Sequence, residues 1–431
     1  MKTKALKNRL SQFLGTEKGL LAMSAIVVLY ALVYHYGKGT FIYPDTETYF
    51  NAYYSLTGGE TDMFRTPVYP LFIGIISSIL GNPYNYIAIL LLQVAIFLLS
   101  VHYFYRIASL LKSDKIAYWL TFIYGVIPIV PSWTPIILTE SLAISGSVFY
   151  LYFTISAVKT GDVKKTWLST LWLLLLVMLR PSFIYLIPVS FFMFLIGNWR
   201  ESRSRKIIYN GLAGCITVTI LFCGYSYRMK RSYGVFTPSA ISVINKYVMD
   251  RDNGSFDINA ITDTEFKTYV DSLQNAEEEL NIYTEALLVI NEFGCERMND
   301  AVKESRKSII GSLKGIDERI YTATRDRYRI ASRIVPFILI EPINPNTGAF
   351  LLLLVITAGV VIAYIYKRKQ LPWITLLLLL FAAGNIAVTV MGAPDDYGRL
   401  QLPSFPAELL LLGLIIQMIK DKTITDNKFE N

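Results

Sequence analysis

Histidine and cysteine are scarce in this sequence. Its 431 residues include two histidines, His35 and His102, and three cysteines, Cys215, Cys223 and Cys295. The cysteines form no Cys-x-x-Cys pair, and two of them fall within one apolar run, so neither a zinc site nor a disulfide framework is indicated. Two histidines also argue against a histidine-based metal centre. No cofactor is indicated, and a divalent metal is left open.

Charged residues are also few. They make up 17% of the chain against 53% hydrophobic residues, and the mean hydropathy is +0.42. A soluble protein of this length would need more polar surface, whereas repeated apolar runs of about 18 or more residues are typical of membrane-spanning helices. The net charge of +8 is concentrated in short segments between those runs, which favours topology determinants over a nucleic-acid surface. The sequence therefore predicts an all-α polytopic membrane protein without a nucleic-acid partner.

The N-terminal residues 1–18 are basic, and an apolar run of residues 19–36 follows them. This pair resembles a secretory signal peptide, but the run continues into aromatic residues and lacks a small-residue cleavage site. We therefore interpret it as an uncleaved first span. Because Lys and Arg favour the cytoplasmic side, the N-terminus is expected in the cytoplasm and the stretch "YPDTETYF" on the outer side of the cell membrane.

The basic short loops assign the remaining spans, which gives about ten in all. They are expected at residues 87–111, 116–131, 141–158, 167–179, 183–198, 207–227, 348–366, 371–391 and 403–419. A span at residues 68–80 would place Arg106, Lys112 and Lys115 outside. That stretch is therefore expected to lie in the membrane interface, within the first outer loop. Both termini are then cytoplasmic.

This topology divides the chain into four parts. Residues 1–228 form a transmembrane catalytic module, 229–346 an extracytoplasmic segment, 347–420 the C-terminal spans and 421–431 a cytoplasmic tail. Apolar residues in the outer segment recur at spacings of three and four, which predicts amphipathic helices. We expect the segment to pack over the outer face, with acceptor binding as the alternative role.

Unusual polar residues collect at span ends on the predicted outer side. They are Asp45, Glu47, Arg65, Glu140, Arg180, Arg228, Arg231, Asp395, Asp396 and Arg399. Ionisable groups at membrane depth are costly unless they pair or line a cavity. Snorkelling or solvation at a span end can explain any single one, but the convergence of several acids and arginines on one face indicates a polar site.

Carboxylates and arginines at a lipid surface suit sugar transfer from a polyprenyl phosphate, whose reactive carbon lies just above the bilayer. A positioned carboxylate can take the proton of an acceptor hydroxyl or amine. Arginine can stabilise the charge on the leaving phosphate. In-line displacement would invert the anomeric centre. The expected partners are a polyprenyl-phosphate-linked sugar, a lipid, glycan or protein acceptor, and membrane lipids.

Several stretches of the chain resemble GT-C glycosyltransferases, in the group of protein O-mannosyltransferases and lipid A aminoarabinose transferases. "YPDTETYFNAYYSLTGGETDMFRTPVYPLFIG" is similar to the family segment after the first span, and "LTESLAI" to an acidic position in the second outer loop. "YRMKRSYGVFTPS" resembles the segment after the seventh span, and "GRLQLPSFPAELLLL" the late family pattern. The resemblance covers most of residues 1–240 and 385–415, and it implies a GT-C-like helical bundle.

The resemblance also implies roles for individual residues. Asp45 and Glu140 are the candidate catalytic residues: Asp45 matches the catalytic acid, and Glu140 a second acidic position near the acceptor or a metal. Arg65 and Arg399 match positions near the lipid phosphate. Further candidates for the donor phosphate are Arg180, Arg228 and Arg231, and further candidates for substrate contact are Glu47, Tyr49, Tyr69, Asp395, Asp396 and Tyr397. The chain departs from the family in two respects. Glu47 stands two residues from Asp45 where the mannosyltransferases have adjacent acids, and residues 236–343 match no family pattern.

Glu47 is instead expected in the first turn of a helix that begins near Thr46, where an acid faces the helix dipole. Two other functions remain alternatives. A flippase or transporter of lipid-linked sugars would show repeats and polar groups at mid-membrane, where this chain has Gln93 and Asn385, both expected in interhelical hydrogen bonds. A polysaccharide polymerase or ligase would use a lipid diphosphate donor.

Overall fold

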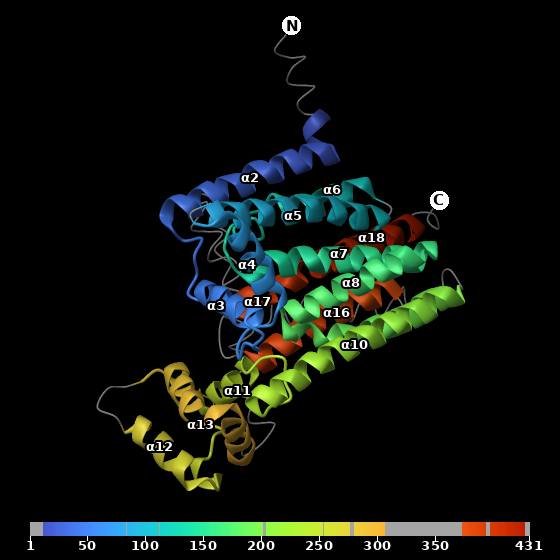
Figure 1. Cartoon of the computed structure of the whole chain (residues 1–431). Helices are drawn as coiled ribbons and strands as arrows, with labels where there is room; N and C mark the ends of the chain where they lie inside the picture. Colours follow the sequence, from blue (N-terminus) through green and yellow to red (C-terminus); the bar gives the residue numbers. More distant parts are fainter. Residues whose placement is uncertain are drawn as a thin grey trace.

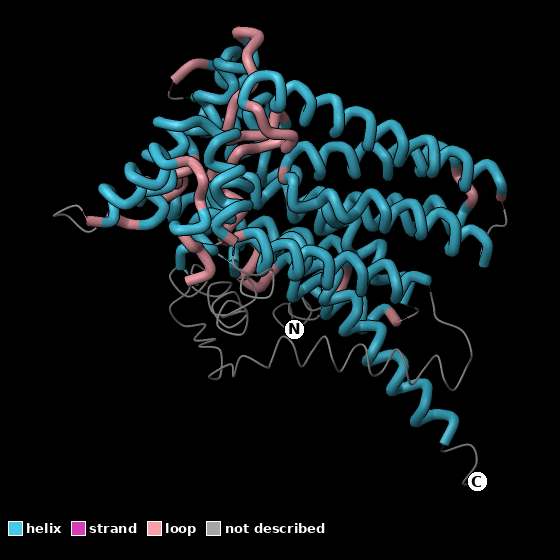
Figure 2. The backbone as a smooth tube through the Cα atoms, turned by 90° about the horizontal axis from the view of Figure 1, so that it is seen from below, coloured by secondary structure: helices cyan, strands magenta, loops and turns pink. Residues whose placement is uncertain are grey.

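The computed structural model is helical throughout the part that it describes, residues 12–82, 84–111, 113–200, 204–252, 254–275, 280–306, 373–393 and 397–426. Within these ranges an isolated bridge between Phe256 and Arg306 is the sole β-type pairing, and Figure 2 shows helices joined by loops. The all-α class predicted from the sequence is confirmed.

The helices that form the bundle and its outer end follow in chain order. They are α2 (Glu17–Lys38), α3 (Thr46–Thr57), α4 (Val68–Leu80), α5 (Tyr84–Ala108), α6 (Asp114–Gly125), α7 (Thr139–Thr160), α8 (Val163–Leu179), η2 (Pro181–Tyr185), α9 (Leu186–Arg200), α10 (Arg205–Tyr233), α16 (Trp373–Gly392), α17 (Tyr397–Gln401), η5 (Leu402–Ser404) and α18 (Phe405–Asp426). The outer segment contains α11 (Ile241–Asp252), η3 (Ile258–Ala260), α12 (Thr264–Gln274) and α13 (Ile282–Ser305).

The long helices lie alongside one another in a bundle, with the outer segment beyond one end of it (Figure 1). Among the described residues, five helices are long and apolar enough to cross a membrane, and three shorter ones are similarly apolar. This supports a membrane-embedded protein. The expected span 348–366 lies outside the described residues, so the count of ten is not tested.

One expected span is shorter than predicted. The sequence suggests 116–131, but α6 ends at Gly125 and is followed by turns. Pro128 and Pro131 lack a backbone N–H and disfavour helical geometry at the residues before them, so the helix cannot continue through them. The buried turns that follow lead directly to the outer end of α7.

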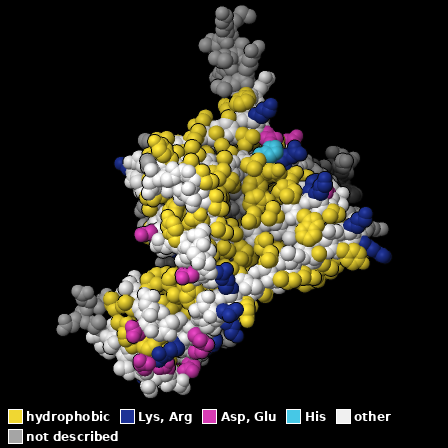
Figure 3. All heavy atoms as spheres, viewed as in Figure 1, with side chains coloured by type: hydrophobic (Ala, Val, Ile, Leu, Met, Phe, Trp, Pro, Cys, Tyr) yellow, Lys and Arg dark blue, Asp and Glu magenta, His cyan; other side chains and the backbone are white. Residues whose placement is uncertain are grey.

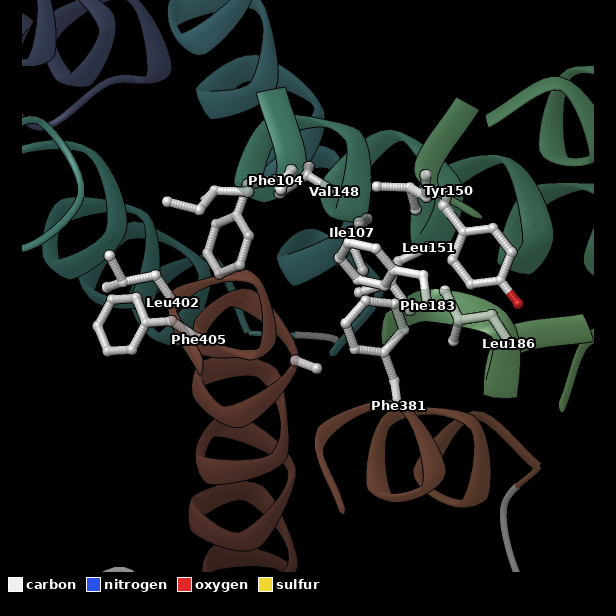
Figure 4. Close-up of a cluster of buried hydrophobic side chains, with 14 of the residues drawn as sticks. Phe104, Ile107, Val148, Tyr150, Leu151, Phe183, Leu186, Phe381, Leu402 and Phe405 are labelled. Atoms are coloured by element: carbon white, nitrogen blue, oxygen red, sulfur yellow. The ribbon is translucent and has the colours of Figure 1, made fainter. Parts of the chain in front are cut away.

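Aromatic and aliphatic side chains fill the bundle. Figure 4 shows Phe183 of η2 and Phe381 of α16 pointing toward one another, with ring centroids 6.4 Å apart. Leu402 and Phe405 bring η5 and α18 into the same core. A membrane supplies little hydrophobic drive between helices, so close packing holds such a bundle together. Its packing fixes the helix ends that carry the polar site.

The outside of the bundle is apolar. Figure 3 shows hydrophobic side chains spread over its visible face, whereas acidic residues gather on the outer segment. Ile26 and Val33 on α2, Ile79 on α4 and Ile220 on α10 are exposed by more than half. An apolar surface of this extent suits contact with lipid.

Helices α3 and α4 lie at the outer-segment end of the bundle, and α4 runs across the direction of the bundle helices (Figure 1). The 13 residues of α4 span only about 20 Å, which is too short for a hydrocarbon core of about 30 Å. Tyr53 of α3 is hydrogen-bonded to Ser78 of α4 at 2.7 Å, and its ring fills the space beside Gly74. This arrangement agrees with the interfacial position expected for residues 68–80.

The outer segment has its own small core. Tyr247 of α11, Phe266 of α12 and Val289 of α13 are buried in it. These helices agree with the amphipathic spacing in the sequence, and residues 307–346 lie outside the described part. Helix α10 continues to Tyr233 and joins the bundle to this second core.

Candidate active site

The candidate site forms where several elements meet at the end of the bundle that faces the outer segment (Figure 1). Each charged member comes from a different stretch of chain. Asp45 directly precedes α3, Arg65 lies in the loop before α4, Glu140 is in the first turn of α7, Arg180 follows α8, and Arg399 belongs to α17. The structure brings these five together through one chain of ion pairs.

Asp45 is bound by two arginines. Arg65 Nη2 donates to Oδ1 at 2.9 Å, and Arg399 Nη1 donates to Oδ2 at 3.2 Å. Burial would raise the pKa of Asp45, but the charges of Arg65 and Arg399 outweigh it and hold the pKa below its usual value. The Asp45 side chain is still 32% exposed. It is therefore an ionised carboxylate that a ligand can reach.

Glu140 is the buried member of the pair of acids, with 2% of its side chain exposed. Its Oε1 lies 3.5 Å from Arg180 Nη1 and 3.5 Å from Arg399 Nε. Arg399 therefore contacts both carboxylates at once, and its guanidinium also stacks over the Tyr43 ring at 5.1 Å. The two acids hold Arg399 in one place.

Among the described residues the site carries more positive than negative charge, because three arginines share two carboxylates there. Guanidinium groups bind phosphate and carboxylate oxygens in the same geometry. A cluster with surplus arginine is therefore suited to bind an anionic ligand. Such a ligand would compete with Asp45 for the guanidinium groups.

The backbone around Asp45 is tied to the turn before α7. Thr46 Oγ1 donates to the Ile137 carbonyl at 2.9 Å, and the Ile137 N–H donates to the Phe41 carbonyl at 2.9 Å. These bonds join two segments about 90 residues apart and set Asp45 beside Glu140. Arg180 reaches the site because Pro181 ends α8 and leaves Arg180 in extended geometry.

Arg65 is held from both ends. Asp62 Oδ1 accepts hydrogen bonds from the N–H groups of Phe64 and Arg65, which shapes the loop as an Asx-type turn. The Arg65 side chain donates from Nε to Thr48 Oγ1 at 2.8 Å and lies 4.4 Å over the Tyr49 ring. Arg65 Nη1 also donates to the Tyr49 hydroxyl at 3.3 Å.

Tyr49, which lies under the Arg65 guanidinium, packs against the second tyrosine predicted for substrate contact, Tyr69. Tyr49 and Tyr69 meet edge to face at 4.9 Å, and the Tyr69 hydroxyl donates to Gln93 Oε1 at 2.9 Å. Gln93 in turn donates to the Thr134 and Ile136 carbonyls. Gln93 therefore makes the interhelical hydrogen bond expected from the sequence, and it links α5 to the turn before α7. The same expectation is wrong for the buried Asn385, whose Nδ2 and Oδ1 have no hydrogen-bond partner among the described residues.

Other predicted site residues lie apart from this cluster. Glu47 is exposed in the first turn of α3, which begins at Thr46 as expected. Arg228 Nη2 donates to the Gly59 carbonyl at 2.5 Å, and Arg231 is exposed on the last turn of α10. Asp395 and Asp396 lie outside the described residues, and of Tyr397 only its place at the start of α17 is described.

Sequence reasoning missed Thr48, Tyr43 and Asp62. Thr48 and Tyr43 contact the site arginines, and Asp62 shapes the arginine loop. Asp62 had a usable signal, since an Asp two or three residues before a functional residue can fold a turn around it. Thr48 and Tyr43 have no comparable signal, because nothing in the sequence distinguishes them from the other threonines or from the other tyrosines, of which the chain has 29 in all.

The described residues do not fit a divalent metal. No group of three His, Cys, Asp or Glu side chains comes together among them. Asp45 and Glu140 both face arginine, and a cation would have to displace that guanidinium charge.

Residues 65–224 match the family model of the dolichyl-phosphate-mannose-protein mannosyltransferases. This match begins at Arg65 and includes Glu140 and Arg180. A search of curated proteins found no match. The resemblance to the GT-C group seen in the sequence is therefore supported by an independent comparison, and it is confirmed.

Solved structures give the fold. The oligosaccharyltransferase of Archaeoglobus fulgidus in its apo form superposes with a TM-score of 0.51 at 11% identity, covering 96% of this chain and 52% of that one. The archaeal oligosaccharyltransferase AglB of the same organism, solved with an inhibitory peptide and a dolichol-phosphate, gives a TM-score of 0.49 at 11% identity, covering 96% and 51%. The chain spans about half the length of these structures. The fold class is a GT-C-like helical bundle.

Proposed function

We propose that this protein is an integral-membrane glycosyltransferase that moves a sugar from a polyprenyl-phosphate carrier to an acceptor at the outer face of the membrane. The observation that carries the proposal is a partly exposed carboxylate, Asp45, set between Arg65 and Arg399. The family match over residues 65–224 supports the donor class.

The reaction needs one base and one anion site. Asp45 takes the proton as the acceptor oxygen or nitrogen attacks the anomeric carbon. The bond from that carbon to the phosphate oxygen breaks, and its electron pair stays on the polyprenyl phosphate. Attack opposite the leaving group inverts the anomeric centre. Arg65 and Arg399 stabilise the charge that grows on the phosphate.

Asp45 serves better as the base than Glu140 does. Its side chain is 32% exposed against 2% for Glu140, and a base must reach the proton that it removes. Glu140 instead acts as a positioning residue, since its carboxylate lies 3.5 Å from both Arg180 and Arg399. This refines the catalytic role that the sequence predicts for Glu140.

The arginines also tune the base. Arg65 and Arg399 outweigh burial and lower the pKa of Asp45, which makes it a weak base. A donor phosphate accepts hydrogen bonds from the same guanidinium groups and neutralises part of their charge. Asp45 then loses the partners that lower its pKa, and its basicity rises when the donor is present.

The test uses protein purified in detergent and membranes from a strain that lacks the gene, because those membranes contain unreacted donor and acceptor. Mass spectrometry follows the lipids. We expect loss of a polyprenyl-phosphate sugar and gain of the polyprenyl monophosphate. Movement of the intact lipid-linked sugar across sealed vesicles, without its consumption in detergent, would favour a transporter. Release of a polyprenyl diphosphate would favour a polymerase or ligase.

A further inference from the structure

The loop that carries Arg65, residues 59–65, is held by one stretch of chain far away in the sequence. We call it the Arg65 loop. Its carbonyl groups accept bonds from the outer end of α10 and the turn that follows: Arg228 Nη2 to Gly59 (2.5 Å), Tyr233 Oη to Thr61 (2.5 Å), the Ala240 N–H to Met63 (2.8 Å), Ser239 Oγ to Phe64 (2.6 Å) and Tyr225 Oη to Arg65 (3.4 Å). The backbone of the loop is therefore held by the end of α10 and, through Tyr233, Ser239 and Ala240, by the beginning of the outer segment.

The side chains of the loop make the same connection. Met63 and Phe64 pack against the core of the outer segment, together with Tyr233. The loop returns to the bundle at Thr66, whose Oγ1 donates to the Leu179 carbonyl at 3.0 Å. The backbone of Arg65 thus lies in a loop that packs on the outer segment, while its side chain points into the candidate site.

We propose that the outer segment is a positioning element of the active site, and that Tyr233 and Ser239 are positioning residues that set the Arg65 guanidinium against Asp45 and the donor phosphate. This inference rests on the proposed function, because the phosphate role of Arg65 comes from it. It assigns a role to the stretch from Tyr233 to Ala240, through which the chain passes from α10 into the outer segment, and to the core of that segment, on which Met63 and Phe64 pack.

The geometry makes small displacements costly. Arg65 Nη2 reaches Asp45 at 2.9 Å and Nε reaches Thr48 at 2.8 Å, so a shift of about 1 Å in the loop breaks both bonds, and misplacement on that scale can cost about 100-fold in rate. Burial would lower the pKa of Arg65, but Tyr49, Asp45 and, from α13, Tyr283 raise it.

The first test removes single hydrogen-bonding groups. Tyr233→Phe and Ser239→Ala each delete one bond to the loop and keep the packing. Tyr269→Phe on α12 is the matched control, since it deletes a tyrosine hydroxyl in the outer segment at a place without contact to the loop. We expect about a fivefold fall in the initial rate of donor consumption for each loop variant, and an unchanged rate for the control.

The second test separates positioning from general stability. Each loop variant is combined with Arg65→Ala, and the rates form a double-mutant cycle. If the outer segment acts through Arg65, the loop variants cause no further loss once Arg65 is gone. Equal losses in both backgrounds would overturn the proposal. A fall in thermal stability that accounts for the lost rate would also overturn it.

A binding measurement keeps this inference apart from the proposed function. Farnesyl phosphate is titrated into the wild type, Tyr233→Phe and Arg65→Ala in detergent. Weaker binding in both variants supports the positioning role even if no transfer is found, in which case the function alone fails. Binding that weakens in Arg65→Ala but not in Tyr233→Phe contradicts the positioning role while leaving the anion site intact.

Discussion

The outer segment and the candidate active site both contain carboxylates bound by arginine, but the two arrangements differ. In the outer segment Arg306 donates to Asp250 Oδ2 from Nε and Nη2 at 2.9 and 2.8 Å, and Asp250 is fully buried. Glu285 accepts from Arg251 at 3.3 Å and also from the Tyr247 hydroxyl. Each of these two buried acids has its own arginine, whereas Asp263 and Glu265 on the surface of the segment share Arg297.

Within the described part of the chain the candidate site instead has three arginines for two acids, and one acid is partly exposed. A balanced buried pair resists separation because an unpaired charge is costly there. A cluster with surplus charge and an accessible carboxylate is open to a ligand that supplies the missing anion. The difference indicates that the outer pairs maintain structure while the inner cluster performs chemistry.

The largest expected effect is on transfer. Asp45→Asn should reduce the rate by about 1,000-fold or more, in the range for loss of a general base, while the protein still elutes as a folded species. Glu47→Gln, two residues away, is the matched acid-to-amide control. If Asp45→Asn retains full activity, Asp45 is not the base.

The outer pairs should respond in stability. Asp250→Asn leaves Arg306 facing an uncharged group, and Glu285→Gln does the same to Arg251. Each should lower the free energy of unfolding by about 3–5 kcal/mol, as loss of one partner of a buried pair does. Thermal unfolding in detergent measures it. If a variant keeps its unfolding temperature but loses transfer, the outer pairs act in the reaction and do not mainly maintain structure.

Arg399→Ala tests the shared arginine. The rate should fall by about 10- to 100-fold through loss of charged hydrogen bonds. The pH profile should also change. Asp45 works only when ionised, so activity is lost as the pH falls through its pKa. Because Arg399 is one of the charges that lower this pKa, its removal moves the acid limb to higher pH. An acid limb at the same pH as in the wild type would contradict the claim that Arg399 lowers the pKa of Asp45.

The smallest expected effect is at Arg231. This exposed residue on α10 lies apart from the cluster, so Arg231→Ala should change the transfer rate by about twofold or less. Arg180→Ala is the informative comparison, because the sequence treats these two arginines alike and only Arg180 contacts Glu140. Comparable losses in the two variants would mean that the described cluster does not define the site.

Much of the site follows from the sequence. Asp45, Arg65, Glu140, Arg180 and Arg399 all stand at span ends on one predicted side, and the charge rule alone groups them. The charge rule cannot tell which of the charged residues on that side contact one another. Arg180 reaches Glu140 because Pro181 ends its helix, whereas Arg231 remains on the α10 surface, and that choice depends on helix packing.

The dependence of Arg65 on the outer segment could not be predicted. The bonds from Tyr233 and Ser239 join residues more than 170 positions apart, and no local pattern encodes such pairing. The early end of α6 could have been predicted better, because Pro128 and Pro131 lie inside the expected span 116–131. The span was predicted from its apolar composition, without regard to the two prolines.

The central claim is that Arg65 and Arg399 hold the donor phosphate while Asp45 competes for them and takes the proton. The most direct test is the affinity of Asp45→Asn for farnesyl phosphate, measured by titration in detergent. The account predicts that this variant, inactive in transfer, binds the phosphate about tenfold more tightly than the wild type, because the competing carboxylate is gone. Weaker binding in Asp45→Asn would contradict it.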